Sequence, residues 1–199
     1  MLNGLEKPTS GMIYIKEKNI NDYNINELRR TFFAYVFQRI GLFPHMTIEK
    51  NIEIVLRINK IPQNSWAKRI EALLELMHLN PLTYLDRYPD QLSGGEQQRI
   101  GVARALATDS ECLLMDEPFG ALDAVTRCEL QDEILNLKKE LKKTIIFVTH
   151  DIAEAFKLGD RIAVMQNGRI EQIGKKEDLI HSPQTPFVEQ LVHTNYQLA

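Results

Sequence analysis

The sequence predicts an α/β domain in which a parallel sheet is built from strands alternating with helices. Two apolar runs of strand length, 112–115 and 144–149, flank a long stretch of helical spacing at 124–143. The segment 47–90 reads as helix and turn alone, so it forms a helical subdomain inserted between strands. We therefore expect one domain over 1–199 with helices on both faces of its sheet.

The composition is that of an ordinary globular chain, and it bears on which partners, which cell compartment and which cysteine chemistry the sequence predicts. The 199 residues are 44% hydrophobic and carry a net charge of −3, which argues against a nucleic acid partner. Without a spanning apolar run or an N-terminal signal, we expect a cytoplasmic chain that reaches a membrane only through another protein. Cys112 and Cys128 stand far apart, which predicts neither a disulfide nor a metal site.

The N-terminal elements are short. Met1, Leu2 and Leu5 have helical spacing and predict the last turn of a helix. A strand over 12–16 and a loop follow, and then a helix over 25–30. A brief buried strand over 35–37 ends at Gln38.

The helical subdomain has recognisable boundaries. Thr47 begins one helix and Pro62 ends it, and Ser65 opens a second. The second helix carries one apolar stripe, made of Ile70, Leu73, Leu74 and Met77. A further helix begins near Ser93.

The C-terminal third continues the alternation. A helix over 151–157 precedes two short strands, 161–165 and 169–173, joined by the strong hairpin signal Asn167-Gly168. The tail over 175–195 reads as two short helices.

The octapeptide LSGGEQQR (92–99) places Ser93, Gly94 and Gly95 at a helix start. Backbone N–H groups there can approach a phosphate closely, and the helix dipole favours its negative charge. For an SGG tripeptide alone, the simpler interpretation is an N-cap followed by a turn. The full octapeptide favours phosphate binding.

The run LLMDEPFGALD (113–123) ends an apolar strand in two carboxylates. Asp116 suits Mg²⁺, which takes oxygen ligands and keeps several waters, and Glu117 is placed to polarise an attacking water. The alternative is that both acids only begin the turn before Pro118.

Two further polar residues close strands. His150 follows the strand in TIIFVTHD, and Gln38 follows an earlier one. Ligands in open α/β sheets bind at the carboxyl ends of strands, so these residues and the two acids can form one site. The alternatives are a hydrogen-bonded structural histidine and a solvated loop amide.

Together these motifs resemble those of ABC transporter ATPases. LSGGEQQR resembles the ABC signature, LLMDEP the Walker B motif, GALD the D-loop, Gln38 the Q-loop and His150 the switch histidine. The segments YVFQRIGLFPHMTIEKNI and MDEPFGALDAVTR are similar to the ATPase subunits of importers for glycine betaine, choline, carnitine or proline. The resemblance implies the P-loop NTPase-like ABC ATPase core, with ATP and Mg²⁺ as cofactors.

The resemblance also implies roles for single residues. Glu117 is then the general base, His150 contacts the γ-phosphate, and Gln38 and Asp116 serve the Mg²⁺. The nucleotide-binding residues, which face ATP held by a partner subunit or cross the dimer interface, are Ser93, Gly94, Gly95, Glu96, Gln97 and Asp123.

The partners implied are a second ABC ATPase subunit, identical or different, and transmembrane permease subunits. Residues 41–52 and the helical subdomain receive the permease, residues 87–90 relay that contact, and a substrate-binding protein takes part indirectly. The chain is then a peripheral protein on the cytoplasmic face of the inner or plasma membrane.

One family motif is missing from the 199 residues. The P-loop G-x-x-x-x-G-K-[ST] does not occur; at the one Gly-Lys pair, Gly174-Lys175, Arg169 and Lys176 occupy the required glycine and hydroxyl positions. We expect a chain shortened at its N-terminus, lacking the P-loop and the strands before it, with weak ATP binding and exposed apolar sheet. The alternative is a degenerate, non-catalytic subunit that serves a complete partner as an interaction module.

Overall fold

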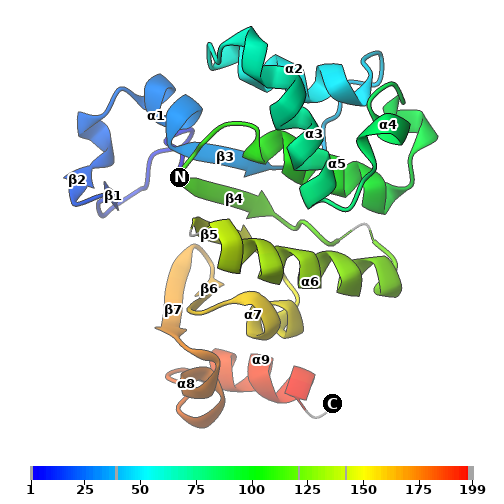
Figure 1. The fold of residues 1–199 in the computed structure, drawn as a ribbon. Coiled ribbons are helices and arrows are strands. Elements are labelled where there is room, and N and C mark those ends of the chain that lie inside the picture. The colour runs from blue at the N-terminus through cyan, green and yellow to red at the C-terminus, as the bar shows by residue number, and fades with distance from the viewer. Residues whose placement is uncertain (1, 39, 121, 142, 197–199) are drawn as a thin grey trace. The chain divides into compact units, whose positions relative to one another are not determined.

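The computed structural model describes residues 2–38, 40–120, 122–141 and 143–196. The chain divides into two compact units, residues 1–148 and 149–199, which are described separately (Figure 1).

The N-terminal segment differs from the prediction. Residues 2–6 form a turn and bends instead of a helix end, with Asn3 Oδ1 accepting a hydrogen bond from the Leu5 backbone at 3.1 Å. Met1 lies outside the described residues. The strand expected over 12–16 is reduced to β1 (Tyr14–Ile15), which pairs antiparallel with β2 (Lys18–Asn19) because positive φ angles at residues 16 and 17 reverse the chain.

A three-stranded parallel sheet forms the centre of the first unit. Its order is β3 (Phe33–Val36), β4 (Cys112–Asp116), β5 (Thr144–Val148). Val36 pairs with Met115, and Asp116 with Val148, so all three carboxyl ends lie at one edge. This confirms the α/β class. The strand predicted over 35–37 begins two residues earlier.

Helices contact both faces of β3. α1 (Ile25–Thr31) packs Leu28 into a cluster with Phe33 and Cys112, and α5 (Gly94–Leu106) also contacts the strand. The apolar run 144–149 is typical of a buried strand, but the neighbouring strand β5 that it forms is only partly buried. Ile146 and Val148 are 37% and 58% exposed, since side chains alternate across a strand and one face of β5 is uncovered.

The segment 47–90 contains helices throughout, as predicted. Thr47 caps the first by accepting from the Lys50 backbone at 3.4 Å. Ser65 precedes the main second helix, but its hydroxyl donates to the Pro62 carbonyl at 2.7 Å instead of capping. The predicted apolar stripe from Ile70 to Met77 is buried. The elements are α2 (Ile48–Ile58), η2 (Gln63–Ser65), α3 (Trp66–Leu76), α4 (Pro81–Tyr84) and η3 (Pro89–Gln91).

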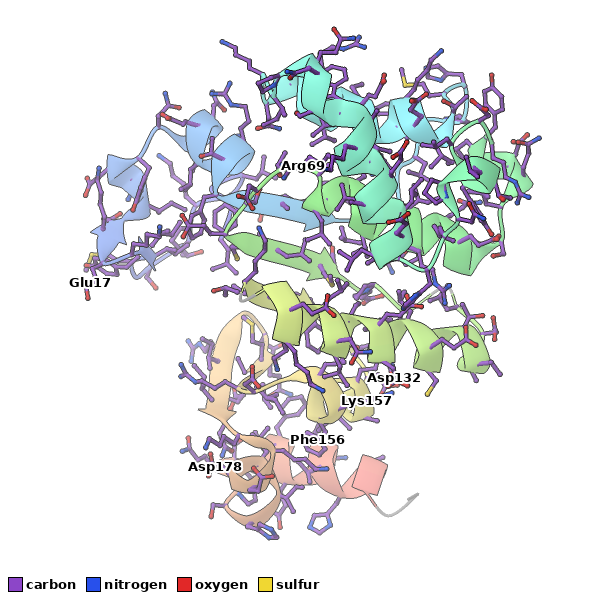
Figure 2. All side chains as sticks on the ribbon, in the orientation of Figure 1. Glu17, Arg69, Asp132, Phe156, Lys157 and Asp178 are labelled. Atoms are coloured by element: carbon purple, nitrogen blue, oxygen red, sulfur yellow. The ribbon has the colours of Figure 1, made fainter. Side chains whose placement is uncertain are left out.

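The second unit carries the predicted hairpin. Asn167 and Gly168, with φ of 51° and 75°, join its two strands, as a type I′ turn requires. Asp178, labelled in Figure 2, accepts from the Lys175 backbone at 2.8 Å and caps α8. The elements are α7 (Ile152–Leu158), β6 (Ile162–Gln166), β7 (Arg169–Gly174), α8 (Lys176–His181) and α9 (Pro186–Tyr196).

In the first unit, α6 (Ala124–Leu141) is the long helix predicted over 124–143; Lys142 lies outside the described residues. Among the described residues, no helix has both the length and the low polarity required to cross a membrane.

Candidate functional site

Ser93 is the N-cap of α5, as its sequence context predicts. Its Oγ accepts from the Glu96 backbone at 3.3 Å, and its own backbone N–H donates to Glu96 Oε2 at 2.7 Å, which completes a capping box. The hydroxyl also donates to Glu96 Oε2 at 2.7 Å. Gly94 is exposed beside it, with open space where a Cβ would stand. The helix start therefore offers a hydroxyl and an uncovered backbone to a ligand.

Glu96 and Gln97 make hydrogen bonds within the chain. The Tyr84 hydroxyl, at the end of α4, donates to Glu96 Oε1, and this bond is the main cause that lowers the pKa of Glu96 and raises that of Tyr84. Gln97 Nε2 donates to the Pro89 carbonyl at 2.9 Å. Both side chains thus tie the start of α5 to the helical segment before it.

Gly95 allows α5 to approach the start of α6. A Cβ at this position would lie 2.3 Å from Thr126 Cγ2. Asp123 accepts from the Thr126 hydroxyl at 2.6 Å and from its backbone at 3.1 Å, and these bonds lower the pKa of the Asp123 carboxyl. Ser93 and Asp123 therefore belong to one packed arrangement, joined through Gly95 and Thr126. Ala121, in the expected D-loop, lies outside the described residues.

The carboxyl edge of the sheet brings Gln38 and Glu117 together. Gln38 Nε2 donates to Glu117 Oε2 at 2.7 Å, although the two residues are 79 positions apart. Glu117 has a φ of +42°, a conformation that costs a non-glycine residue about 1 kcal/mol or more. Its backbone N–H donates to the Val148 carbonyl at 2.9 Å, so β5 stabilises this conformation. Strain of this kind concentrates at functional sites.

The oxygen atoms at this edge fit a magnesium ion. Asp116 ends β4 with its side chain exposed, and Gln38, donating through its nitrogen, keeps its amide oxygen as an acceptor. Carboxylate and amide oxygens are hard ligands, and Mg²⁺ takes few of them from protein while waters and phosphate supply the rest. Among the described residues there is no cluster of three or more His, Cys, Asp or Glu side chains that could hold a metal ion.

His150 belongs to the second unit, two residues after β5 ends. Its inclusion in the same site stays a prediction from sequence.

Comparison with known proteins identifies the family. The family described as ABC transporter matches residues 1–120. The chain belongs to the ABC transporter family.

Among solved structures, the ATP-binding cassette MJ0796 bound to ADP and Pi is 34% identical, with a TM-score of 0.74 over 87% of this chain and 76% of that one. The cbiO1 structure from Clostridium perfringens has a TM-score of 0.80 at 28% identity, over 99% of this chain and 76% of that one.

Curated relatives belong to ABC importers. The choline transport ATP-binding protein OpuBA of Bacillus subtilis (strain 168) is 50% identical over 96% of this chain and 50% of the relative. The carnitine transport protein OpuCA of Listeria monocytogenes is 50% identical over 96% and 48%, and the osmoprotectant import protein OsmV of Salmonella typhimurium 48% identical over 96% and 50%. The chain thus spans about half the length of these relatives.

Three residues of this ABC transporter chain that sequence reasoning missed make contacts around these segments: Tyr84 with Glu96, Arg104 with the Ile40 carbonyl, and Thr126 with Asp123. Arg104 lies four positions after Ile100 on the apolar stripe of α5, and a charge on such a stripe is a usable signal. Tyr84 has no comparable signal, because Glu96 becomes its neighbour only on folding. Thr126 bonds to Asp123, three positions earlier, but its contact with Gly95 forms only on folding.

A pocket of about 590 Å³ lies at the opposite edge of the sheet. Phe33, Cys112 and Thr144, the first residues of β3, β4 and β5, line it. None of the predicted site residues contributes to it, so its size does not mark the chemistry.

Proposed function

We propose that the chain is the ATP-binding and ATP-hydrolysing part of a bacterial ABC importer, working as a dimer with an identical or different ATPase subunit. The observation that carries this proposal is the Gln38–Glu117 hydrogen bond at the carboxyl edge of the sheet. It holds a carboxylate beside Asp116, where a water attacking a phosphate needs a group to orient it. Family membership supports the same activity.

The roles follow from the chemistry of each group. Glu117 orients the attacking water as general base, while Gln38 fixes the direction of its carboxylate. Asp116 and the amide oxygen of Gln38 hold Mg²⁺, which when bound neutralises charge on the phosphates. For His150, the proposed contact with the γ-phosphate rests on its position after β5 in the sequence.

The start of α5 serves a nucleotide held by the partner subunit. When that nucleotide is bound, the Ser93 hydroxyl turns its proton from Glu96 Oε2 to the γ-phosphate, and the exposed backbone at Gly94 adds N–H donation at a helix N-terminus. Gly95, Glu96 and Gln97 contribute by keeping this helix start in place, and Asp123 faces the dimer interface.

The transported substrate is an osmoprotectant such as choline, carnitine or glycine betaine. The choline, carnitine and osmoprotectant transport functions of the relatives support this substrate class. Phe43 and Tyr88, 39% and 43% exposed, provide an apolar surface for a permease subunit at the cytoplasmic face of the membrane. Uptake of the labelled compounds by cells expressing this chain with its permease tests the proposal, and uptake of none of them would refute it.

An assay in trans tests the role of Ser93. The partner is a complete ABC ATPase subunit with a P-loop, whose own signature serine is replaced by aspartate so that its homodimer is inactive. Adding this chain should restore ATP turnover at least about tenfold, roughly the effect of 1.4 kcal/mol on a barrier. Ser93→Asp keeps an N-cap residue but repels phosphate, and should abolish the gain. Equal ATP turnover with the unchanged chain and with the Ser93→Asp variant contradicts the proposal.

The 199-residue polypeptide by itself should bind ATP weakly, because its residues contain no G-x-x-x-x-G-K-[ST] segment to hold the phosphates. The same observation favours the second candidate function, a non-catalytic module that offers its signature to a complete partner. Titration with a fluorescent ATP analogue and Mg²⁺ is the direct test, and micromolar affinity refutes weak binding.

A further inference from the structure

The far end of α5 holds the loop that follows Gln38. Arg104 donates from Nη2 to the Ile40 carbonyl at 2.6 Å and from Nη1 to the Gly41 carbonyl at 2.8 Å. Hydrogen bonds from a charged donor are stronger than neutral ones, and a guanidinium can make two such bonds in a fixed geometry. Burial lowers the pKa of Arg104, in keeping with a largely desolvated side chain.

The same turn of α5 contacts this loop through a glycine. A Cβ at Gly101 would lie 2.7 Å from Ile40 Cγ2, so the loop packs directly on the helix backbone. Gly101 and Arg104 therefore fix both the side chain and the carbonyl of Ile40, two positions after Gln38.

A second buried polar residue holds the remainder of the loop. Asn51 of α2 is fully buried, accepts from the Phe43 backbone at 2.7 Å, and donates to the Phe43 and Met46 carbonyls at 3.1 and 3.0 Å. Between Gln38 at one end and Asn51 at the other, the loop has its main-chain carbonyls bound at Ile40, Gly41 and Phe43. These contacts hold the main chain of the described loop residues Ile40, Gly41 and Phe43.

We propose that Arg104 is a positioning residue that sets the Gln38–Glu117 contact by fixing the backbone at Ile40 and Gly41. Its importance for turnover rests on the proposed function of Gln38 and Glu117. Arg104 lies eleven residues after Ser93, about 16 Å along a continuous helix. Helix α5 thus carries both Ser93, at its start, and Arg104, which binds the backbone two and three positions after Gln38.

The test follows the side-chain amide of Gln38 by NMR in the 199-residue chain labelled with ¹⁵N-glutamine. Gln38→Asn assigns the resonance by its loss, and Glu117→Gln gives its position without a carboxylate acceptor. Arg104→Lys, which cannot bind both carbonyls in the same geometry, should move the Gln38 amide signals toward their position in Glu117→Gln. Arg99→Lys is the matched control, since Arg99 lies on the same helix but pairs with Glu133 of α6 at 2.8 Å, and it should leave the signals in place.

A second pair of variants keeps the test decisive if Arg104→Lys does not fold. Gly101→Ala pushes on Ile40 without changing charge, so it should shift the Gln38 signals, and adding Ile40→Ala should restore them. If Arg104→Lys or Gly101→Ala lowers the thermal midpoint but leaves the Gln38 amide unmoved, the positioning role is refuted. That outcome leaves the in-trans turnover assay, and hence the proposed function, unaffected.

Discussion

Replacing Gly95 with alanine tests how tightly α5 packs against the start of α6. The added Cβ would meet Thr126 Cγ2 at 2.3 Å, well inside van der Waals contact. Thr126 cannot rotate away freely, because its hydroxyl donates to Asp123 Oδ2 at 2.6 Å. The methyl group must therefore displace the helix or break a hydrogen bond to a carboxylate.

The expected loss of folding stability follows from comparing Gly95 with the neighbouring Gly94. Overpacking costs about 1–3 kcal/mol, while alanine gains up to about 1 kcal/mol over glycine in a helix. A Cβ at Gly94 meets no heavy atom of the described residues within 4 Å, so Gly94→Ala carries the gain without the clash. Gly95→Ala should thus be about 1–3 kcal/mol less stable than Gly94→Ala.

Urea unfolding of the two variants measures this difference, since the midpoint reports stability when the slope is unchanged. The double variant Gly95→Ala with Thr126→Ser removes the clashing methyl group and keeps the hydroxyl, so it should recover most of the loss. Equal stability of the two alanine variants, or no recovery in the double variant, would refute the packing argument.

Two further predictions concern titratable groups. The folded-state pKa of Glu96 is below its ordinary value of 4.5, chiefly through Tyr84, so this carboxylate contributes stability above pH 4.5 that is lost as pH falls through the lowered value. Tyr84→Phe should reduce the stability lost between neutral pH and about pH 3, measured by urea midpoints; an unchanged acid dependence would contradict the contact. Burial raises the pKa of Cys112 to about 11, whereas Cys128 is exposed, so a thiol reagent at mildly alkaline pH should label Cys128 in the folded protein and Cys112 only after unfolding. Rapid native labelling of a Cys128→Ser variant would show that Cys112 is accessible.

Local patterns predicted several elements because the interactions that form them are local. The Ser93 N-cap is confirmed since its partner, the Glu96 backbone, lies three residues away. The Asn167-Gly168 hairpin is confirmed for the same reason, because a two-residue turn needs only positive φ at both positions.

The errors lie where distant segments decide the outcome. The apolar run of β5 was predicted as buried, but burial depends on what packs against each face, and Ile146 and Val148 remain exposed. At the N-terminus, the helical spacing of the apolar residues predicted a helix end, but the described residues 2–6 form a turn and bends. Gly4 there has a φ of +66°, and its carbonyl accepts from Arg29 at 2.7 Å, a contact with α1 that spacing cannot reveal.

The sequence by itself determined the family, the order of strands and helices, and the residue types suited to phosphate and magnesium chemistry, because each motif is a contiguous run with its own periodicity. Only the tertiary structure decided which of these residues meet. Gln38 reaches Glu117 because two parallel strands end at the same edge of the sheet. Arg104 becomes a positioning group, and Thr126 meets Gly95, because packing brings together atoms that are far apart along the chain, and hydrogen bonds and van der Waals contacts form only at such short range.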